Sequence, residues 1–318
     1  MHGNALADKM AETAPGALSA TAKPPAEASA RDTAKARAPF SLRGPGRTLL
    51  TVLPLAIVVL ALLVAILGPT LGGLDPFEQD LLERNKGPSE VYLLGTDHLG
   101  RDVLARLIVG TRLSLEAGLG GVVVALALGG LLGFAASVAG GVAETAFYAF
   151  VDLIRAMPGV LLALLLVVAL GAGLGPVTVA LGVTFAPIFA YVARATYRRE
   201  LAMDYVTAAE SFGASGWRIL MTHILPNVSG AFVTQGAIVL PRCIVTESVL
   251  SFLGLGVEPD TPTWGRMIAQ ASQFIERNPV AVLAPVIALS LLTISLALLG
   301  DRLRRRLDPR RIDEGAAA

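Results

Sequence analysis

Four long stretches of the chain contain no Asp, Glu, Lys or Arg. They cover residues 48–74, 117–143, 156–193 and 278–300. A helix that crosses the roughly 30 Å hydrocarbon layer of a membrane needs about 20 apolar residues, and each stretch is long enough to supply one. The pattern therefore predicts an all-α integral membrane protein that crosses the bilayer several times.

Turn residues and charges divide the chain into six predicted transmembrane helices. They lie at about 48–71, 115–138, 145–170, 176–195, 227–247 and 279–300. The glycine- and proline-rich run at 171–176 separates the third span from the fourth, because these residues interrupt helices. Gly129 and Gly133, four residues apart in the second span, form a small-xxx-small pattern that permits close helix contact. The polar segments between the spans become the loops.

The distribution of Lys and Arg near the span ends predicts the orientation. With both termini inside, the flanks on the cytoplasmic side carry 16 basic residues and the outer flanks carry 7. Loops on the cytoplasmic side of membrane proteins are enriched in basic residues. The bias predicts an N-in, C-in topology, although the charged first outer loop works against it.

Composition and the rarer residues exclude several classes of function. Hydrophobic residues make up 54% of the 318 residues and charged residues only 16%, with a net charge of +1 and no nucleic-acid signature. The single Cys243 cannot form an intrachain disulfide, and the three histidines are too far apart to form a metal-ligand cluster. No lysine lies in a Gly-Lys-Ser/Thr phosphate loop. If transport is driven by ATP, another chain must bind the nucleotide.

The chain is expected to have one membrane domain between two tails. Residues 1–47 are rich in Ala, Pro and charge and poor in bulky apolar residues, so they predict a disordered cytoplasmic tail. Residues 48–300 form the six-span domain, which includes a cytoplasmic loop at 196–226. Residues 301–318 form a second cytoplasmic tail.

The loop at 199–226 carries two apolar stripes at helical spacing. Leu201, Tyr205, Ala208 and Phe212 form the first stripe, and Trp217, Leu220, Met221 and Ile224 form the second. The sequence Gly-Ala-Ser-Gly at 213–216 interrupts them, and Pro226 is expected to end the second helix. The apolar faces could lie on lipid, pack on the chain's own spans or dock on a partner. The pattern alone favours lipid or self-packing.

The same loop resembles the "EAA" loop of permease subunits in binding-protein-dependent ABC importers. The resemblance rests on Ala208-Ala209, on Gly213 and on Ile224-Leu225-Pro226. Thr207 stands where the general pattern has Glu, and His223 stands where it has Ile. The sequence His-Ile-Leu-Pro-Asn at 223–227 is similar to the version found in the peptide/nickel branch.

Three further segments, in the expected order, resemble that branch. They are LGTDHLGRD at 94–102, Glu-Ser followed by SFLGLG within 247–256, and GDRL with LDP within 300–309. The resemblance covers about residues 48–311 and is closest to the C-type subunit of oligopeptide and dipeptide permeases. It implies the six-helix permease fold of type I ABC importers.

The resemblance also implies a mechanical role for the loop. In this family the loop docks in a cleft of an ATPase subunit and couples ATP binding to a switch of the membrane helices between inward and outward access. Gly213 would permit the bend, Ala208 and Ala209 would permit close approach, and Phe212 and Trp217 would be the apolar anchors. The loop site as a whole comprises Thr207, Ala208, Ala209, Phe212, Gly213, Trp217, His223, Ile224, Leu225 and Pro226.

The partners follow from the same resemblance. A second, B-type permease subunit would complete the pathway, two ABC ATPase subunits would bind ATP and Mg²⁺, and an extracytoplasmic binding protein would deliver the substrate. The chain itself is expected to be non-enzymatic, to bind no cofactor, metal or nucleic acid, and to lie among lipids of the bacterial cytoplasmic membrane. Its substrate would be a dipeptide or oligopeptide, with nickel or another small solute as the alternative.

Charged residues near the membrane supply the other candidate site. Arg242 and Glu247 flank the predicted outer end of the fifth span, where they could line the translocation path or extend to the interface. Asp152 and Arg155, three residues apart, are expected to pair at the membrane boundary. The turn at 95–102 is expected to start an interfacial helix before the second span, with contact to a binding protein as the alternative.

Two other classes of function remain open on the residues alone. A secondary transporter would couple an ion to Asp152, Arg242 or Glu247 and would not need the loop. A structural membrane scaffold would have no open path. The four ordered motifs favour the importer over both.

Overall fold

The computed structural model describes residues 46–68, 75–258 and 260–307. Within these ranges the regular structure is helical apart from one isolated bridge between Thr96 and Asp102. Most of the predicted N-terminal tail, the end of the first predicted span and the end of the C-terminal tail lie outside the described residues. The helices, including two π-helical turns labelled η, are α2 Gly46–Leu67, α3 Val103–Ala125, η3 Leu126–Leu131, α4 Leu132–Ala139, α5 Gly141–Arg155, α6 Gly159–Leu170, α7 Leu174–Leu201, α8 Asp204–Ser211, α9 Gly216–Ile219, η4 Leu220–Ile224, α10 Leu225–Phe252, α11 Trp264–Ser272 and α12 Pro279–Leu307.

Four continuous helices among the described residues are long and apolar enough to cross a membrane. They cover Val103–Ala139, Leu174–Leu201, Gly216–Phe252 and Pro279–Leu307. A fifth crossing is possible if α5 and α6 act as one broken span. The described apolar part of α2, Val52–Leu67, is shorter than the about 20 residues that a straight crossing needs. The structure therefore confirms the predicted bundle of apolar helices, and among the described residues four or five segments, rather than the predicted six, are long and apolar enough to cross a membrane.

The prediction of one continuous third span over 145–170 is wrong. The axis bends by 95° between α5 and α6. Pro158 lies at the bend, at the N-cap of α6. Its ring cannot donate a backbone hydrogen bond, and it disfavours helical geometry at Met157 before it.

The second span begins earlier than predicted. The expected interfacial helix after residue 102 is instead the first part of α3, which continues through η3 and α4 to Ala139. Asp102 starts this helix because its side chain accepts a hydrogen bond from the Leu104 amide at 2.8 Å.

Pro226 does not end a helix, contrary to the prediction. It lies in the first turn of α10, directly after η4. The wider π turn accommodates a residue that lacks an amide hydrogen, so the helix continues through Phe252.

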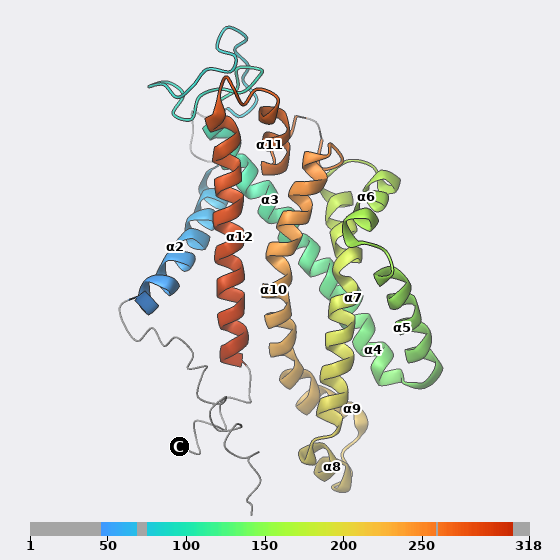
Figure 1. Ribbon diagram of the computed structural model, residues 1–318. Helices are drawn as coiled ribbons and strands as arrows, with labels where there is room; N and C mark the ends of the chain where they lie inside the picture. Colours follow the sequence, from blue (N-terminus) through green and yellow to red (C-terminus); the bar gives the residue numbers. More distant parts are fainter. Residues whose placement is uncertain (1–45, 69–74, 259, 308–318) are drawn as a thin grey trace, which may run out of the picture. The chain divides into compact units, whose positions relative to one another are not determined.

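The long helix α3–η3–α4 packs on α7 (Figure 1). Glycines form the closest part of this contact, and α7 is the most buried of the four spans. A Cβ atom on Gly129 would lie 1.9 Å from the carbonyl oxygen of Ala186, and one on Gly133 would lie 2.9 Å from Cα of Ala190. The small-xxx-small pattern is thus a close backbone contact between the two helices.

This contact predicts a position-specific cost of adding a methyl group. We expect Gly129→Ala to lower the free energy of unfolding by about 1–3 kcal/mol, because the backbones must separate. Gly230 in α10 is the matched control, since nothing among the described residues outside its own helix turn lies within 4 Å of the position that a Cβ atom would take. Gly230→Ala should be neutral or slightly stabilising. Thermal unfolding of the purified protein in detergent measures both, and equal effects would contradict the contact.

Candidate functional site

A compact helix–turn–helix connects α7 to α10 at the end of the bundle opposite α11 (Figure 1). The helix α8 ends at Ser211, and α9 begins at Gly216. Between them Gly213 adopts a φ of +79°, which is costly for a residue with a Cβ atom. Ser215 caps α9 by accepting a hydrogen bond from the Arg218 amide at 3.4 Å. The predicted bend between two short helices is present. We call residues 202–224 the α8 loop.

The inner face of the α8 loop is fixed by a buried aliphatic cluster. Val206, Ile219, Ile224 and Val228 are each at most 3% exposed and pack together. The predicted first stripe had a different phase because Leu201 belongs to α7 and α8 begins only at Asp204. The residues of α8 that face inward are therefore Tyr205, Val206 and Ala209.

The outer face of the α8 loop carries two exposed aromatic rings. The Phe212 side chain is 91% exposed and the Trp217 side chain is 68% exposed. Thr207, Ala208 and Gly213 are exposed beside them. Large aromatic rings in water are typical of interaction sites, because burying them is strongly favourable.

The remaining loop residues of the sequence prediction lie closer to the bundle. Ala209 and His223 are half-buried, and Ile224 is buried. The His223 ring lies 5.9 Å from the Tyr205 ring, centre to centre. Leu225 and Pro226 are exposed at the start of α10. Among the predicted loop residues, Phe212 and its neighbours are therefore exposed on the outer face, and Ile224 is the one that is fully buried.

A cavity of about 870 Å³ opens along α10. Helices α6, α7, α10 and α12 contribute its lining: Gly159, Val160, Thr184, Phe185, Ile188, Ile238, Pro241, Arg242, Val245, Thr246, Thr293, Ile294, Ala297, Leu298 and Asp301. Most of these side chains are apolar. The charged groups on the cavity are Arg242 and Asp301, and Asp301 also lies 3.9 Å from Arg305.

The structure separates the two predicted path residues. Arg242 is exposed on the cavity, and within the described ranges it makes no hydrogen bond or ion pair. Glu247 is fully buried and accepts a hydrogen bond from Ser251 at 2.7 Å. Five residues along a helix correspond to a rotation of about 140°, so the two side chains point to different sides of α10.

Asp152 and Arg155 lie near each other on α5, as predicted, but the pair is weak. The closest oxygen–nitrogen distance is 4.0 Å, and both side chains are more than half exposed. The shorter contact of Asp152 is a hydrogen bond that it accepts from the Tyr191 hydroxyl at 2.5 Å. This contact joins α5 to α7.

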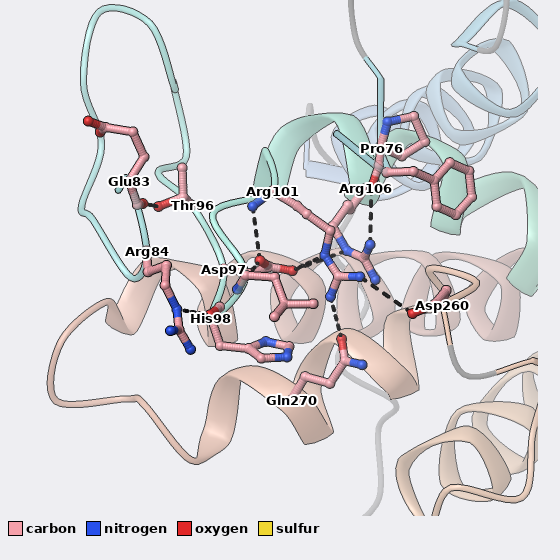
Figure 2. A network of polar contacts seen from close by, with 12 residues as sticks. Pro76, Glu83, Arg84, Thr96, Asp97, His98, Arg101, Arg106, Asp260 and Gln270 are labelled. Carbon is pink, nitrogen blue, oxygen red and sulfur yellow. Dashed lines mark hydrogen bonds and ion pairs between the residues drawn. The ribbon is translucent and has the colours of Figure 1, made fainter. Parts of the chain in front are cut away.

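The motif at 94–102 forms a buried charge network at the other end of the bundle (Figure 2). The Asp97 carboxylate accepts a hydrogen bond from Arg101 Nε at 2.7 Å, and Arg106 Nε lies 3.6 Å away. Both arginines are 1% exposed. Arg106 also donates to the carbonyl oxygen of Pro76 at 3.0 Å, and Arg101 donates to Gln270 at 3.4 Å. The network therefore holds the 75–102 segment against α3 and α11.

Two glycines and a histidine complete this turn. Gly95 and Gly100 have φ values of +75° and +78°, and a Cβ atom on Gly100 would collide with the backbone of Asp80. His98 stacks on Phe274 with 5.9 Å between ring centres. Burial lowers the pKa of His98 from its ordinary value; Asp97 opposes this shift, and the nearby arginines reinforce it. These contacts support the structural interpretation of the motif.

The described residues form apolar helices that pack through glycines, with a helix–turn–helix at one end, which is the architecture of a helical membrane protein. Residues 121–313 match the model of the family described as "Binding-protein-dependent transport system inner membrane component". The chain belongs to this family.

Curated relatives cover most of the chain. One is the "Di/tripeptide transport system permease protein DppC" of Pseudomonas aeruginosa, which is 38% identical over 80% of this chain and 86% of the relative. Another is the "Glutathione transport system permease protein GsiD" of Pectobacterium atrosepticum, 38% identical over 74% of this chain and 77% of the relative. The "Dipeptide transport system permease protein DppC" of Haemophilus influenzae is 34% identical, and the alignment covers 80% of this chain and 89% of the relative.

A solved structure shows the same fold. A chain of the MetNI methionine ABC transporter in an inward-facing conformation aligns with a TM-score of 0.53 at 20% identity. The alignment covers 64% of this chain and 97% of that chain. The fold is therefore that of an ABC importer permease.

The network around Asp97 predicts a large effect of removing one charge. We expect Asp97→Asn to lower the free energy of unfolding by about 3–5 kcal/mol, because two buried arginines lose their nearest counter-charge and only the exposed Asp260, 3.9 Å from Arg101, remains. Glu83→Gln is the control, since Glu83 pairs with Lys86 on the surface and should change stability by about 1 kcal/mol or less. Denaturation of the purified protein in detergent compares them. A small effect for Asp97→Asn would show that the network is not structural.

Proposed function

We propose that this chain is a permease subunit of an ATP-driven importer for short peptides. The names of its relatives support this substrate class, because dipeptides, tripeptides and glutathione are all short peptides. In this proposal the chain crosses the bacterial cytoplasmic membrane six times. Both termini lie in the cytoplasm, and the α8 loop faces the cytoplasm as well. A second permease subunit, two ATPase subunits and an external binding protein complete the transporter.

The observation that carries the coupling role is the exposure of Phe212 and Trp217. Two large aromatic rings that lie exposed on one face of a short helical turn form an apolar surface suited to burial by another protein. We assign them to the contact with an ATPase subunit, with Ala208 and Gly213 allowing close approach. The ATPase subunits bind ATP and Mg²⁺, and this chain supplies the surface that moves with them.

The cavity along α10 supports a role in the translocation path. Its volume of about 870 Å³ exceeds that of a short peptide, and its lining is apolar with few polar groups. Arg242 has a guanidinium group without a partner among the described residues. An arginine in such a setting can form a charge-assisted hydrogen bond with a peptide carboxylate. Glu247, in contrast, would reach the path only after a rearrangement of α10.

The first test removes the exposed rings. We expect Phe212→Ala and Trp217→Ala each to reduce peptide uptake about tenfold or more and to weaken co-purification of the ATPase subunit, because central aromatic contacts dominate interfaces. Phe150→Ala on α5 is the matched control, since Phe150 is 60% exposed but lies outside the loop. Normal uptake and co-purification in both loop variants would contradict the docking role.

The second test concerns the charge on the cavity. We expect Arg242→Ala to reduce the maximal uptake rate about tenfold, since a charge-assisted hydrogen bond contributes about 1.5–3 kcal/mol. Arg242→Lys keeps the charge and should retain part of the rate. Affinity of the binding protein for the peptide, measured separately, should not change. Full uptake by Arg242→Ala would remove Arg242 from the path.

A further inference from the structure

Three polar side chains from three different helices meet where α8 adjoins the ends of α7 and α10. They are Glu200 in the last turn of α7, Tyr205 in the first turn of α8, and Asn227 in the first turn of α10. We call this group the polar joint. In the sequence, Tyr205 belongs to an apolar stripe and Asn227 ends the His-Ile-Leu-Pro-Asn motif, whereas Glu200 belongs to neither pattern.

The Tyr205 hydroxyl is the centre of the polar joint. It donates a hydrogen bond to Glu200 Oε2 at 2.5 Å and accepts one from Asn227 Nδ2 at 3.2 Å. The other carboxylate oxygen of Glu200 accepts a hydrogen bond from Arg199 Nη2 at 2.8 Å. Glu200 is only 5% exposed, so its charge depends on these donors.

The protonation of Tyr205 suits this arrangement. Burial raises the pKa of the phenol above its ordinary value, and the hydrogen bond to Glu200 raises it further. The hydroxyl therefore remains a donor throughout the physiological pH range. Its hydrogen bond to the carboxylate is charge-assisted and stronger than a neutral one.

Covalent connections alone would not fix α8. The segment between α7 and α8 is only Ala202–Met203, and the far side of α8 ends in the turn at Gly213. Such short tethers hold the ends of a helix in place but permit it to tilt. The buried cluster around Val206 limits tilting by packing, and the polar joint adds directional contacts to both α7 and α10.

We propose that Tyr205 is a positioning residue that makes α8 move as one body with the ends of α7 and α10. The proposal rests on the proposed function, in which an ATPase subunit docks on the outer face of the α8 loop. Trp217 lies on the helix that continues into α10, whereas Phe212 lies at the far end of α8. A force on Phe212 then reaches the ends of α7 and α10 through the buried cluster and through this hydroxyl group. Rigid coupling of this kind needs a discrete contact rather than a flexible tether.

The chain offers a matched control for a test of the hydroxyl. Tyr197 on α7 packs against the same buried cluster, with its ring 5.3 Å from that of Phe134. Within the part of the chain that the structure describes, its hydroxyl makes no hydrogen bond. Tyr205→Phe and Tyr197→Phe therefore remove the same atom from the same neighbourhood, but only the first breaks the polar joint.

The experiment uses the complete transporter reconstituted in liposomes, with its binding protein and a labelled dipeptide. For Tyr205→Phe we expect ATPase co-purification and basal ATP hydrolysis to stay unchanged. The melting temperature should fall by only a few degrees, because Glu200 keeps its hydrogen bond from Arg199. Stimulation of ATP hydrolysis by the loaded binding protein and peptide uptake should both fall about tenfold. Tyr197→Phe should behave like the unmodified protein.

Asn227→Ala provides a second variant, because Asn227 is exposed and its loss removes the α10 contact while leaving the bond between Tyr205 and Glu200. We expect a smaller loss of the same two activities. Unchanged stimulation and uptake in Tyr205→Phe would overturn the proposal. Losses that accompany reduced co-purification, or a large drop in melting temperature that shows general unfolding, would also overturn it. Failure of the docking role itself is distinguishable, because it appears as normal co-purification and uptake in the Phe212 and Trp217 variants.

Discussion

Burial of four aliphatic side chains holds the α8 loop against the ends of α7 and α10. Val206 comes from α8, Ile219 and Ile224 from the second half of the loop, and Val228 from α10. Full burial of such a side chain contributes about 1.5–3 kcal/mol. Because the inner face is already occupied by aliphatic groups, the rings of Phe212 and Trp217 remain on the outside.

The membrane part provides the stiffness that this surface needs. Glycines at 129 and 133 bring the α3–η3–α4 helix into backbone contact with α7, and the charge network around Asp97 fixes the opposite end. A displacement of α8 therefore acts on helices that are packed along their length. The helices α5 and α6 do not form such a continuous packed helix. The 95° break at Pro158 leaves them as two separate segments, each of which contacts α7.

Local patterns were sufficient to predict the apolar helices, the loop and its bend at Gly213. Charge-free stretches reveal apolar helices because no charge can be placed cheaply in hydrocarbon. The break at Pro158 and the continuity through Pro226 were missed, because one proline follows an ordinary turn and the other follows a π turn. The phase of the first stripe was wrong because it depends on where α8 begins. The contacts of Tyr205 with Glu200 and Asn227, and of Asp97 with Arg106, depend on distances between side chains that spacing along the chain does not reveal.

The central claim is that another subunit covers the outer face of the α8 loop. A photoreactive amino acid placed at Phe212, in the intact transporter in its native membrane, measures this directly. If an ATPase subunit covers this face, the probe at Phe212 forms an adduct with that subunit, and the same probe at Phe150 does not. Adducts with lipid or with this chain alone, in a transporter that still imports its substrate, would contradict it.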